Sequence, residues 1–494
     1  MSTLNCSKRE VVFLYPNPYG VGIRRLTTIN NMPLALLCLS AFLEKHGIPT
    51  RIIDTRAEDF RSYDYAKALY VGITVLTGGM IKNGLELARY VRNTRPDLPI
   101  VWGGVHPSSL PVQTVEHPLI DAVCVGEGER VALKLAQNLM SGGKMEDIAG
   151  IVTKSSGLHK QPWLNMDEIP ALPYDKLNLP LYKSSTYFEF PTSRGCPHQC
   201  IFCYNQAFNK DSTLNQPSFR MQSSLHVLDQ LERVAHQYPV STVGFIEDNF
   251  FAKRSRVSEI AEGIVRKGLK FSWFANGVAS YFRNYDDEFM CLLRKSGCFR
   301  IDIGGESGSP KILKKVGKGT VPEDIIHSAI KCAKNGIRCS YSFIIGWPDE
   351  TDEDRDMTLA MIDRLAREAP QMWINAIYVI TAFPGTAYLD EAIQKGFSPP
   401  DNLEGWAEYL FAVDAEKQTP WHDKKKRETL MTIARLSKTD FLQNSYSRPF
   451  NGRLKNIAFR LMSYDAKLRW RFRFFGFPYE WKIWDSVFRK NQKF

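Results

Sequence analysis

Short apolar runs alternate with longer amphipathic segments over the first 150 residues of the chain. The runs cover residues 11–15, 50–53, 68–73, 100–102 and 122–125, and helical periodicity covers residues 33–46 and 79–94 between them. Such runs, separated by helices, are typical of buried parallel strands. The pattern predicts an α/β fold that begins with a doubly wound, Rossmann-like domain over residues 1–150, where ligands bind beyond the carboxyl ends of the strands.

The alternation stops over residues 151–185, where prolines stand at 162, 170, 173 and 180, and we expect a linker on the surface there. Further strands are expected at 188–192, 242–247, 271–275, 300–303, 340–345 and 374–380. Six strand and helix units predict a partial (β/α)6 barrel over residues 186–395, with its active site at the carboxyl-end loops. Residues 396–494 are expected to form a mainly helical extension that caps the substrate pocket.

Three cysteines lie on one short loop after the first predicted barrel strand. Cys196, Cys200 and Cys203 have the spacing Cys-x-x-x-Cys-x-x-Cys. With 10 cysteines in 494 residues, this triple should arise by chance roughly 0.004 times per chain. Clustered thiolates bind iron-sulfur clusters or zinc, and three of them would leave one iron of a cubane cluster without a protein ligand. The alternatives are a zinc site that His198 completes and three inert thiols.

This spacing, with the aromatic Phe202 before the third cysteine, resembles the motif of the radical S-adenosylmethionine (SAM) superfamily. The resemblance implies a 4Fe-4S cluster on the three cysteines, SAM on its open iron and a 5'-deoxyadenosyl radical. It places SAM contacts on the barrel loops, at Glu247, Asn276, Glu306, Ser307 and Gly346. Glu247 resembles part of the acidic motif that holds the SAM amino group, and Glu306 would accept hydrogen bonds from the ribose hydroxyls. The alternative for Glu306 is a carboxylate at a helix N-terminus.

Small and hydroxyl-bearing residues follow the strands expected in the first domain. Each pair, such as Gly103-Gly104, is alone a common turn signal. In this order, and upstream of the cysteine loop, the set resembles the cobalamin-binding domain of the cobalamin-dependent radical SAM family. The resemblance implies cobalamin contacts at Thr74, Leu76, Gly103, Gly104, His106, Gly126 and Glu127.

One departure concerns the metal of that cofactor. Related methyltransferases and mutases carry Asp-x-His-x-x-Gly after the first strand, whereas residues 15–20 of this chain contain no histidine. The resemblance therefore implies base-off cobalamin with no histidine as lower ligand, which would favour nucleophilic cobalt(I).

The net charge of +11 owes much to Lys and Arg after Lys424, with basic and aromatic residues mixed at 468–475 and 479–484. Such a tail could contact a membrane surface, nucleic acid or an acidic ligand, or be a solvated face. A nucleic-acid substrate is disfavoured because aromatic residues interrupt the basic residues.

The polar first ten residues suggest no secretion signal, so we expect a cytoplasmic protein. Cys291, Cys298, Cys332 and Cys339 do not have the spacing of a second cluster site and are expected to be buried thiols.

These observations favour a cobalamin-dependent radical SAM C-methyltransferase that acts on an unactivated carbon of a small molecule, such as a tetrapyrrole, a lipid or a natural-product intermediate. An electron donor such as flavodoxin or ferredoxin is expected. No residue stands out as an acid, base or nucleophile. The alternatives are a cyclase, oxidase or ring-rearranging enzyme with the same cofactors, and a methylthiotransferase that modifies RNA. A cobalamin sensor without catalysis leaves the cysteine loop unexplained.

Overall fold

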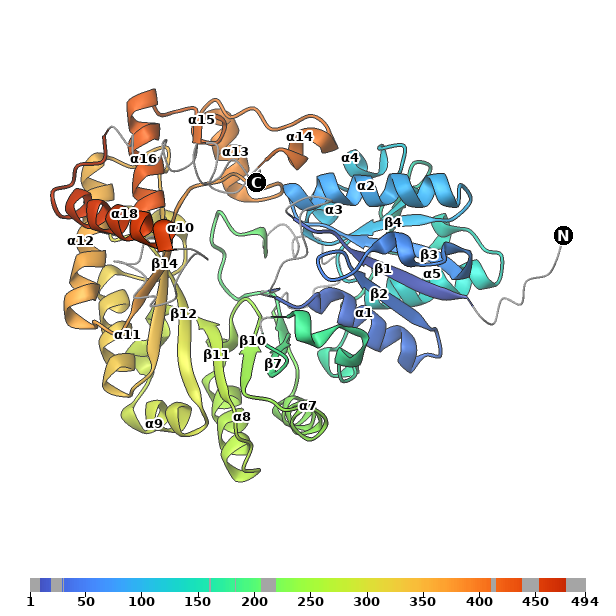
Figure 1. Cartoon of the computed structure of the whole chain (residues 1–494), viewed down its shortest axis with the longest axis horizontal. Coiled ribbons are helices and arrows are strands. Elements are labelled where there is room, and N and C mark those ends of the chain that lie inside the picture. The colour runs from blue at the N-terminus through green and yellow to red at the C-terminus, as the bar shows by residue number, and fades with distance from the viewer. Residues whose placement is uncertain are drawn as a thin grey trace.

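The computed structural model describes residues 9–18, 29, 31–159, 161–182, 184–205, 219–409, 415–437 and 453–476. Within these ranges the chain forms two six-stranded sheets, each flanked by helices, and a carboxyl-terminal group of helices (Figure 1). The cysteine loop lies between the two sheets. Residues 19–20 of the loop without histidine and residues 479–484 of the basic aromatic tail lie outside the described residues.

The first sheet has the strand order β2-β1-β3-β4-β5-β6. Its strands are β1 (Glu10–Tyr15), β2 (Thr50–Asp54), β3 (Ala68–Thr74), β4 (Ile100–Gly103), β5 (Ala122–Cys124) and β6 (Ile151–Thr153). The first five run parallel, and β6 is antiparallel to β5. This order places the topological switch point between β1 and β3. The predicted doubly wound domain is confirmed, whereas β6 was missed because three residues carry no measurable periodicity.

Alternate residues of the strands enter two hydrophobic cores, as the period of two in a strand requires. Val11 and Phe13 pack on the face covered by α1 (Leu34–Lys45) and α5 (Glu129–Met140). Val12 and Leu14 pack on the face covered by α2 (Gly79–Thr94), where α3 (Val105–Ser109) and α4 (Pro111–Val115) also lie. Because both faces are buried, the strands appear in the sequence as continuous apolar runs.

The second sheet has the order β14-β13-β12-β11-β10-β7, with all its described strands parallel. Its strands are β7 (Tyr187–Phe190), β10 (Thr242–Phe245), β11 (Ser272–Gly277), β12 (Cys298–Glu306), β13 (Arg338–Ile345) and β14 (Trp373–Val379). The helices outside it are α7 (Ser224–Gln237), α8 (Arg254–Arg266), α9 (Asp287–Lys295), α10 (Pro310–Val316), α11 (Pro322–Lys334) and α12 (Asp352–Glu368) (Figure 1). The end strands β14 and β7 are not neighbours, so the sheet is the partial barrel that the sequence predicted.

The segment expected to lie on the surface is instead packed between the two sheets. It contains the short turns η5 (Met166–Glu168), η6 (Tyr174–Lys176) and η7 (Leu179–Leu181). Tyr174 is fully buried and its hydroxyl donates to the carbonyl of Glu189 on β7 at 2.5 Å, while the Tyr182 hydroxyl donates to Asp54 on β2 at 2.6 Å. Single buried aromatics on short turns produce no sequence period, which is why the pattern suggested an exposed segment.

The carboxyl-terminal helices are α13 (Ala387–Gln394), α14 (Leu403–Ala407), α15 (Ala415–Gln418), α16 (Lys424–Leu436) and α18 (Arg453–Arg471). Helix α14 packs on α2 of the first domain, and α16 packs on β14 of the barrel, so the extension touches both sheet domains. Within the described ranges, no helix is both long enough and apolar enough to cross a bilayer.

Candidate active site

Two large cavities, formed by described residues, open at the carboxyl ends of the two sheets. One has a volume of about 910 Å³ and lies at the mouth of the barrel. The other has a volume of about 470 Å³ and lies at the ends of β3, β4 and β5. They share the lining residues Leu76, Val105, Tyr204, Asn205, Asp248 and Asn276. Molecules bound in the two cavities would therefore meet.

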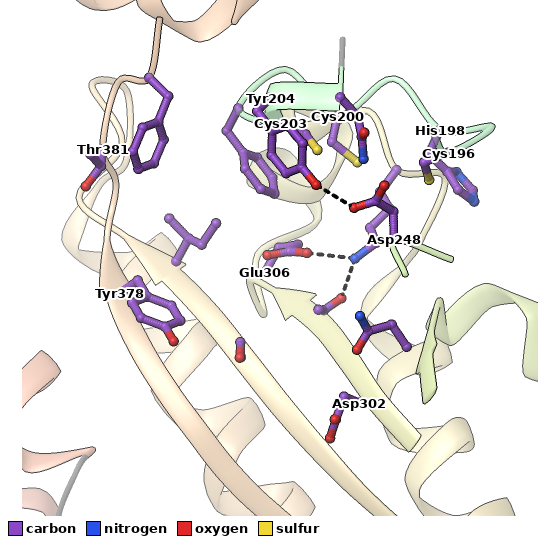
Figure 2. Close-up of a pocket in the computed structure, with 18 of the residues that line it drawn as sticks. Cys196, His198, Cys200, Cys203, Tyr204, Asp248, Asp302, Glu306, Tyr378 and Thr381 are labelled. Atoms are coloured by element: carbon purple, nitrogen blue, oxygen red, sulfur yellow. Dashed lines mark hydrogen bonds and ion pairs between the residues drawn. The ribbon is translucent and has the colours of Figure 1, made fainter. Parts of the chain in front are cut away.

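The cysteine loop follows the short strand β8 (Ser193–Arg194), which pairs antiparallel with β9 (Arg220–Met221). Cys196, Cys200 and Cys203 all line the larger cavity, above the barrel strands that carry Asp302 and Tyr378 (Figure 2). Burial raises the pKa of Cys200 to about 12 and that of Cys203 to about 11. Metal binding must displace these thiol protons, so assembly of a metal centre releases protons here.

The polar neighbours of the cysteine loop are hydrogen-bonded to one another. His198 Nε2 hydrogen-bonds to the Tyr281 hydroxyl at 2.7 Å, and the Asn249 amide donates to the same hydroxyl at 2.8 Å and to Cys196 Sγ at 3.6 Å. Across the described residues, no three His, Cys, Asp or Glu side chains converge on a site for a single ion. A cubane binds each thiolate on a separate iron, so three cysteines that line one cavity suit a cluster.

Three of the expected SAM contacts lie at the cavities. Asn276 lines both and donates to the backbone carbonyl of Glu247 at 2.8 Å. Glu247 lines the smaller cavity; its Oε2 accepts from Thr192 at 2.9 Å, and its buried Oε1 has no partner among the described residues. Burial raises the pKa of Glu247. Glu306 lines the larger cavity, at the end of β12 where the register shifts, and has a positive φ of 60°.

The other two expected SAM contacts, Ser307 and Gly346, are described but line neither cavity. Ser307 is fully buried and its hydroxyl hydrogen-bonds to Thr358 at 2.9 Å. The carbonyl of Gly346 accepts from Trp421 at 3.1 Å, which ties the fifth barrel loop to the carboxyl-terminal extension. The sequence placed both residues correctly at strand ends but could not show the direction in which the chain turns after them.

Lys318 and Asp248 are polar lining residues that the sequence analysis did not select. Lys318 Nζ binds Glu306 Oε1 at 2.7 Å and the Gly304 carbonyl at 2.9 Å, which brings a half-buried cation to the wall of the larger cavity that the cysteines also line. Asp248 accepts from the Tyr204 hydroxyl at 2.9 Å where the cavities meet (Figure 2). The only signal for Lys318 was its position between two glycines.

Six of the seven residues that the resemblance assigned to cobalamin line the smaller cavity: Thr74, Leu76, Gly103, Gly104, Gly126 and Glu127. Gly104 has φ 98°, and a Cβ there would lie 2.8 Å from the Val75 carbonyl oxygen. Leu76 is 51% exposed although it is apolar, and it lies where the two cavities join. A backbone cradle beside an apolar rim fits a large ligand with a buried tail.

His106 is the exception, because it lines neither cavity. Its side chain is fully buried, with Nδ1 hydrogen-bonded to Thr77 at 3.0 Å and with Nε2 unpartnered among the described residues. The ring packs edge-on to Trp406 of α14 at 5.9 Å. Burial lowers the pKa of His106 to about 4, so the imidazole is neutral at physiological pH.

Comparisons with known proteins agree with this architecture. The Radical SAM superfamily model matches residues 190–362, and the B12 binding domain model matches residues 30–136. The chain is 31% identical over 400 residues to an uncharacterized methyltransferase of Pyrococcus horikoshii, covering 78% of this chain and 83% of that protein. It is 27% identical to an anaerobic magnesium-protoporphyrin IX monomethyl ester cyclase of Rubrivivax gelatinosus, over 71% of this chain and 65% of the cyclase.

The solved structure of the cobalamin-dependent SAM radical enzyme OxsB with aqua-cobalamin and SAM has the same fold, with a TM-score of 0.68 at 19% identity, over 98% of this chain and 76% of OxsB. Fold and site thus define a radical SAM enzyme with a cobalamin-binding domain. The chain belongs to the cobalamin-dependent radical SAM family. Membership implies three cofactors, namely a 4Fe-4S cluster, SAM and cobalamin.

The neutral buried state of His106 predicts a pH dependence of stability. The unfolded chain binds a proton at this residue below about pH 6.5, whereas the folded chain does so only near pH 4. Stability should therefore fall as the pH falls through this window, by about 2 kcal/mol at about pH 5 relative to about pH 7. Urea unfolding of the metal-free protein at the two pH values measures this loss.

In the His106→Gln variant the loss of folding stability between about pH 7 and about pH 5 should be smaller by about 2 kcal/mol, because this is the contribution of His106. The matched control is His236→Gln, at an exposed histidine of α7, which should keep the native pH dependence. An undiminished loss in His106→Gln would contradict the prediction.

Proposed function

We propose that this enzyme is a C-methyltransferase that acts on an unactivated carbon of a small molecule. The observation that carries the proposal is the shared wall of the two cavities, where Leu76 and Val105 of the first domain face Asp248 and Asn276 of the barrel. A substrate in the larger cavity would there lie within reach of both cofactor sites. When bound, SAM and the cluster supply a 5'-deoxyadenosyl radical, and cobalamin supplies a methyl group.

We assign a separate role to each of the segments expected from the sequence. Residues 1–150 would bind cobalamin, residues 151–185 would connect, residues 186–395 would bind the cluster and SAM, and residues 396–494 would cap the substrate. Cys196, Cys200 and Cys203 would hold the cluster. The glycines at 103, 104 and 126 would let the cobalamin tail approach the backbone.

Residues at the barrel loops would hold SAM, with Glu306 accepting hydrogen bonds from its ribose hydroxyls as the resemblance implies. Lys318 offers a half-buried cation, and the adjacent carboxylate of Glu306 offers an acceptor. Asn276 presents a side chain to both cavities. The Oε1 atom of Glu247, unpartnered among the described residues, is a further acceptor in the smaller cavity, and a buried acceptor of this kind is stabilised when a donor reaches it.

The lining of the larger cavity supports a small molecule with one polar end. Arg300 and Asp302 form an ion pair at 3.0 Å on β12, and the Arg300 guanidinium lies 3.9 Å from the centre of the Phe274 ring. Ile303, Ile344 and Phe383 are apolar lining residues of the same cavity. Such a lining would orient the polar end on β12 and leave an apolar body for the reacting carbon.

A cyclase or ring-rearranging reaction is the second candidate. Its support is the 27% identity between this chain and the magnesium-protoporphyrin IX monomethyl ester cyclase of Rubrivivax gelatinosus. Either reaction would need a one-electron donor, for which we propose flavodoxin or ferredoxin. The two candidates differ in the fate of the SAM methyl group, which separates them by experiment.

The position of His106 supports a further proposal, that cobalamin is bound base-off without a histidine ligand. The described part of the loop after β1 contains no histidine, and His106 is fixed by Thr77 away from both cavities. Electron paramagnetic resonance of the cobalt(II) protein should show no nitrogen superhyperfine splitting. A nitrogen triplet that persists in the His106→Gln variant would assign the ligand to the nucleotide base or to another histidine, and one that disappears would assign it to His106. Either triplet contradicts the proposal.

The deciding experiment uses SAM with a labelled methyl group and candidate substrates under anaerobic reduction. Methyl transfer should place label in the product and form 5'-deoxyadenosine and S-adenosylhomocysteine in comparable amounts. Cys200→Ala should abolish 5'-deoxyadenosine because the cluster loses a ligand. Cys291→Ala is the matched control, since Cys291 is an exposed thiol on α9, contrary to the expectation from the sequence that it is buried. Turnover with 5'-deoxyadenosine but without labelled product or S-adenosylhomocysteine would reject methyl transfer in favour of the second candidate.

A further inference from the structure

Four charged side chains form a network where the cysteine loop meets the first domain, and we call this network the latch. It consists of Arg194, Arg220, Glu127 and Glu129. Arg194 on β8 and Arg220 on β9 are register partners, so the two arginines mark the beginning and the end of the segment that carries the cysteines. Cys196 follows only two residues after Arg194.

Both carboxylates of the latch come from the first domain, at the start of α5. The Arg194 guanidinium contacts both oxygens of Glu129, one of them at 3.1 Å, and reaches Glu127 at 3.2 Å. Arg220 contacts the two oxygens of Glu127 at 2.6 and 3.2 Å. These are fork-like arginine–carboxylate pairs, which fix direction as well as distance.

The carboxylates allow the two ends of the loop to pair. Like charges directly opposite one another in a strand pair repel, and here two arginines are opposite. Glu127 and Glu129 are 7% and 2% exposed. Burial works to raise the pKa of Glu127, but Arg194 and Arg220 hold it below its usual value. Removal of a carboxylate would leave a half-buried arginine without its partner, which is unfavourable.

All four latch residues also line the smaller cavity, together with Gly126 and Gly128. The same side chains therefore line the smaller cavity and also hold the two ends of the cysteine loop to the first domain. We propose that the latch couples the two sites, so that cobalamin in the smaller cavity strengthens retention of the cluster on Cys196, Cys200 and Cys203. The inference rests on the proposed assignment of the smaller cavity to cobalamin and holds for either candidate reaction. Because coupling is reciprocal, the cluster must strengthen cobalamin binding by the same factor.

The test is iron release from the reconstituted full-length enzyme to a ferrous chelator, with and without hydroxocobalamin. In the native enzyme, hydroxocobalamin should slow release by at least about fivefold, the lower end of typical coupling. In Glu127→Gln/Glu129→Gln it should slow release by less than about twofold at saturating cobalamin. A purely structural role of the glutamates would change release equally with and without cobalamin, and so would leave the ratio intact.

The matched control is Asp121→Asn, which removes a carboxylate from an ion pair of the same domain, 2.5 Å from Arg92, and lines neither cavity. It should keep the native ratio. Should the double variant not fold, Arg220→Lys keeps the charge, loses the fork and should lower the ratio. An unchanged ratio in the folded latch variant, or no protection in the native enzyme, overturns the coupling. Hydroxocobalamin that fails to bind the native enzyme overturns the cavity assignment as well.

A second inference concerns helix α18, on the outside of the molecule near α12 and α16 (Figure 1). One face of the helix is fixed to the barrel: Met462, Ala466 and Trp470 are buried, and the Trp470 indole donates to Asp363 of α12 at 2.7 Å. The opposite face carries Leu461, Tyr464, Leu468 and Phe472, which are 66%, 64%, 39% and 70% exposed. Their spacing of three and four residues places them in one stripe.

Basic side chains border the exposed apolar stripe on one side. Arg460, Lys467 and Arg471 are exposed and fall together on the helix, directly beside the apolar stripe. The acidic residue of this part of the helix, Asp465, is neutralised by Arg469 at 2.8 Å. An apolar stripe with a basic border is complementary to an anionic lipid surface, where apolar side chains enter the interface and cations meet headgroups. We infer that α18 docks the enzyme on anionic membranes.

Sedimentation of the full-length enzyme with vesicles tests this docking. Vesicles of phosphatidylcholine with about one-third phosphatidylglycerol should bind it, and pure phosphatidylcholine should not. Binding should fall by about fivefold for each basic residue removed in Arg460→Gln/Lys467→Gln/Arg471→Gln. Leu461→Ser/Phe472→Ser should abolish it. The matched control is Leu225→Ser, which removes another exposed leucine, 78% exposed on α7, and should change nothing.

Equal binding to both vesicle types, or native binding by the stripe variant, would overturn the inference. A dimer in solution that Leu461→Ser/Phe472→Ser dissociates would assign the stripe to a second copy of the chain instead of to lipid. Light scattering after size exclusion detects that dimer.

Discussion

Two sheets direct the carboxyl ends of their parallel strands toward one common space, and the geometry of the site depends on this arrangement. Neither sheet could provide it alone, because the first contributes a glycine-lined cavity and the second a cavity with three thiols. The packed segment with Tyr174 and Tyr182 binds strands of both sheets. A buried carboxylate adds to this contact, since Glu189 on β7 accepts from the Met32 amide of the first domain at 2.7 Å.

Much of the fold could be predicted because its strands are buried on both faces. Such strands appear as apolar runs, so the expected runs at 11–15 and 340–345 agree with β1 and β13 to within two residues. Two features could not be predicted in this way. Strand β6 is too short to show a period, and Tyr174 is buried by tertiary contacts on a turn whose neighbours are polar. Where a tertiary contact involves one isolated side chain, local pattern carries no information about it.

The candidate site divides along similar lines. Residues whose chemistry is visible in the sequence, such as the three cysteines and Gly104, lie where the motifs indicated. Residues whose importance comes from a partner elsewhere were missed or assigned differently. Lys318 is close to the cysteines only because the chain returns after α10, and Glu127 faces the smaller cavity while both its oxygens bind Arg220. The spacing of a motif shows which residues are near in sequence. An ion pair between residues distant in sequence depends on the tertiary fold, which the spacing does not show.

Glu306 illustrates what the site demands of the chain. It has a positive φ of 60° at a shift in strand register, a conformation that glycine adopts freely and that disfavours glutamate by roughly 1–3 kcal/mol. Gly304 and Gly305 precede it directly, yet the residue in the unfavourable conformation carries a carboxylate bound to Lys318. Glycine at this position would remove the backbone strain but would also leave Lys318 without its carboxylate partner. The strained backbone and the ion pair are therefore linked at one residue, and a substitution that relieves the strain also removes a charge from the wall of the larger cavity.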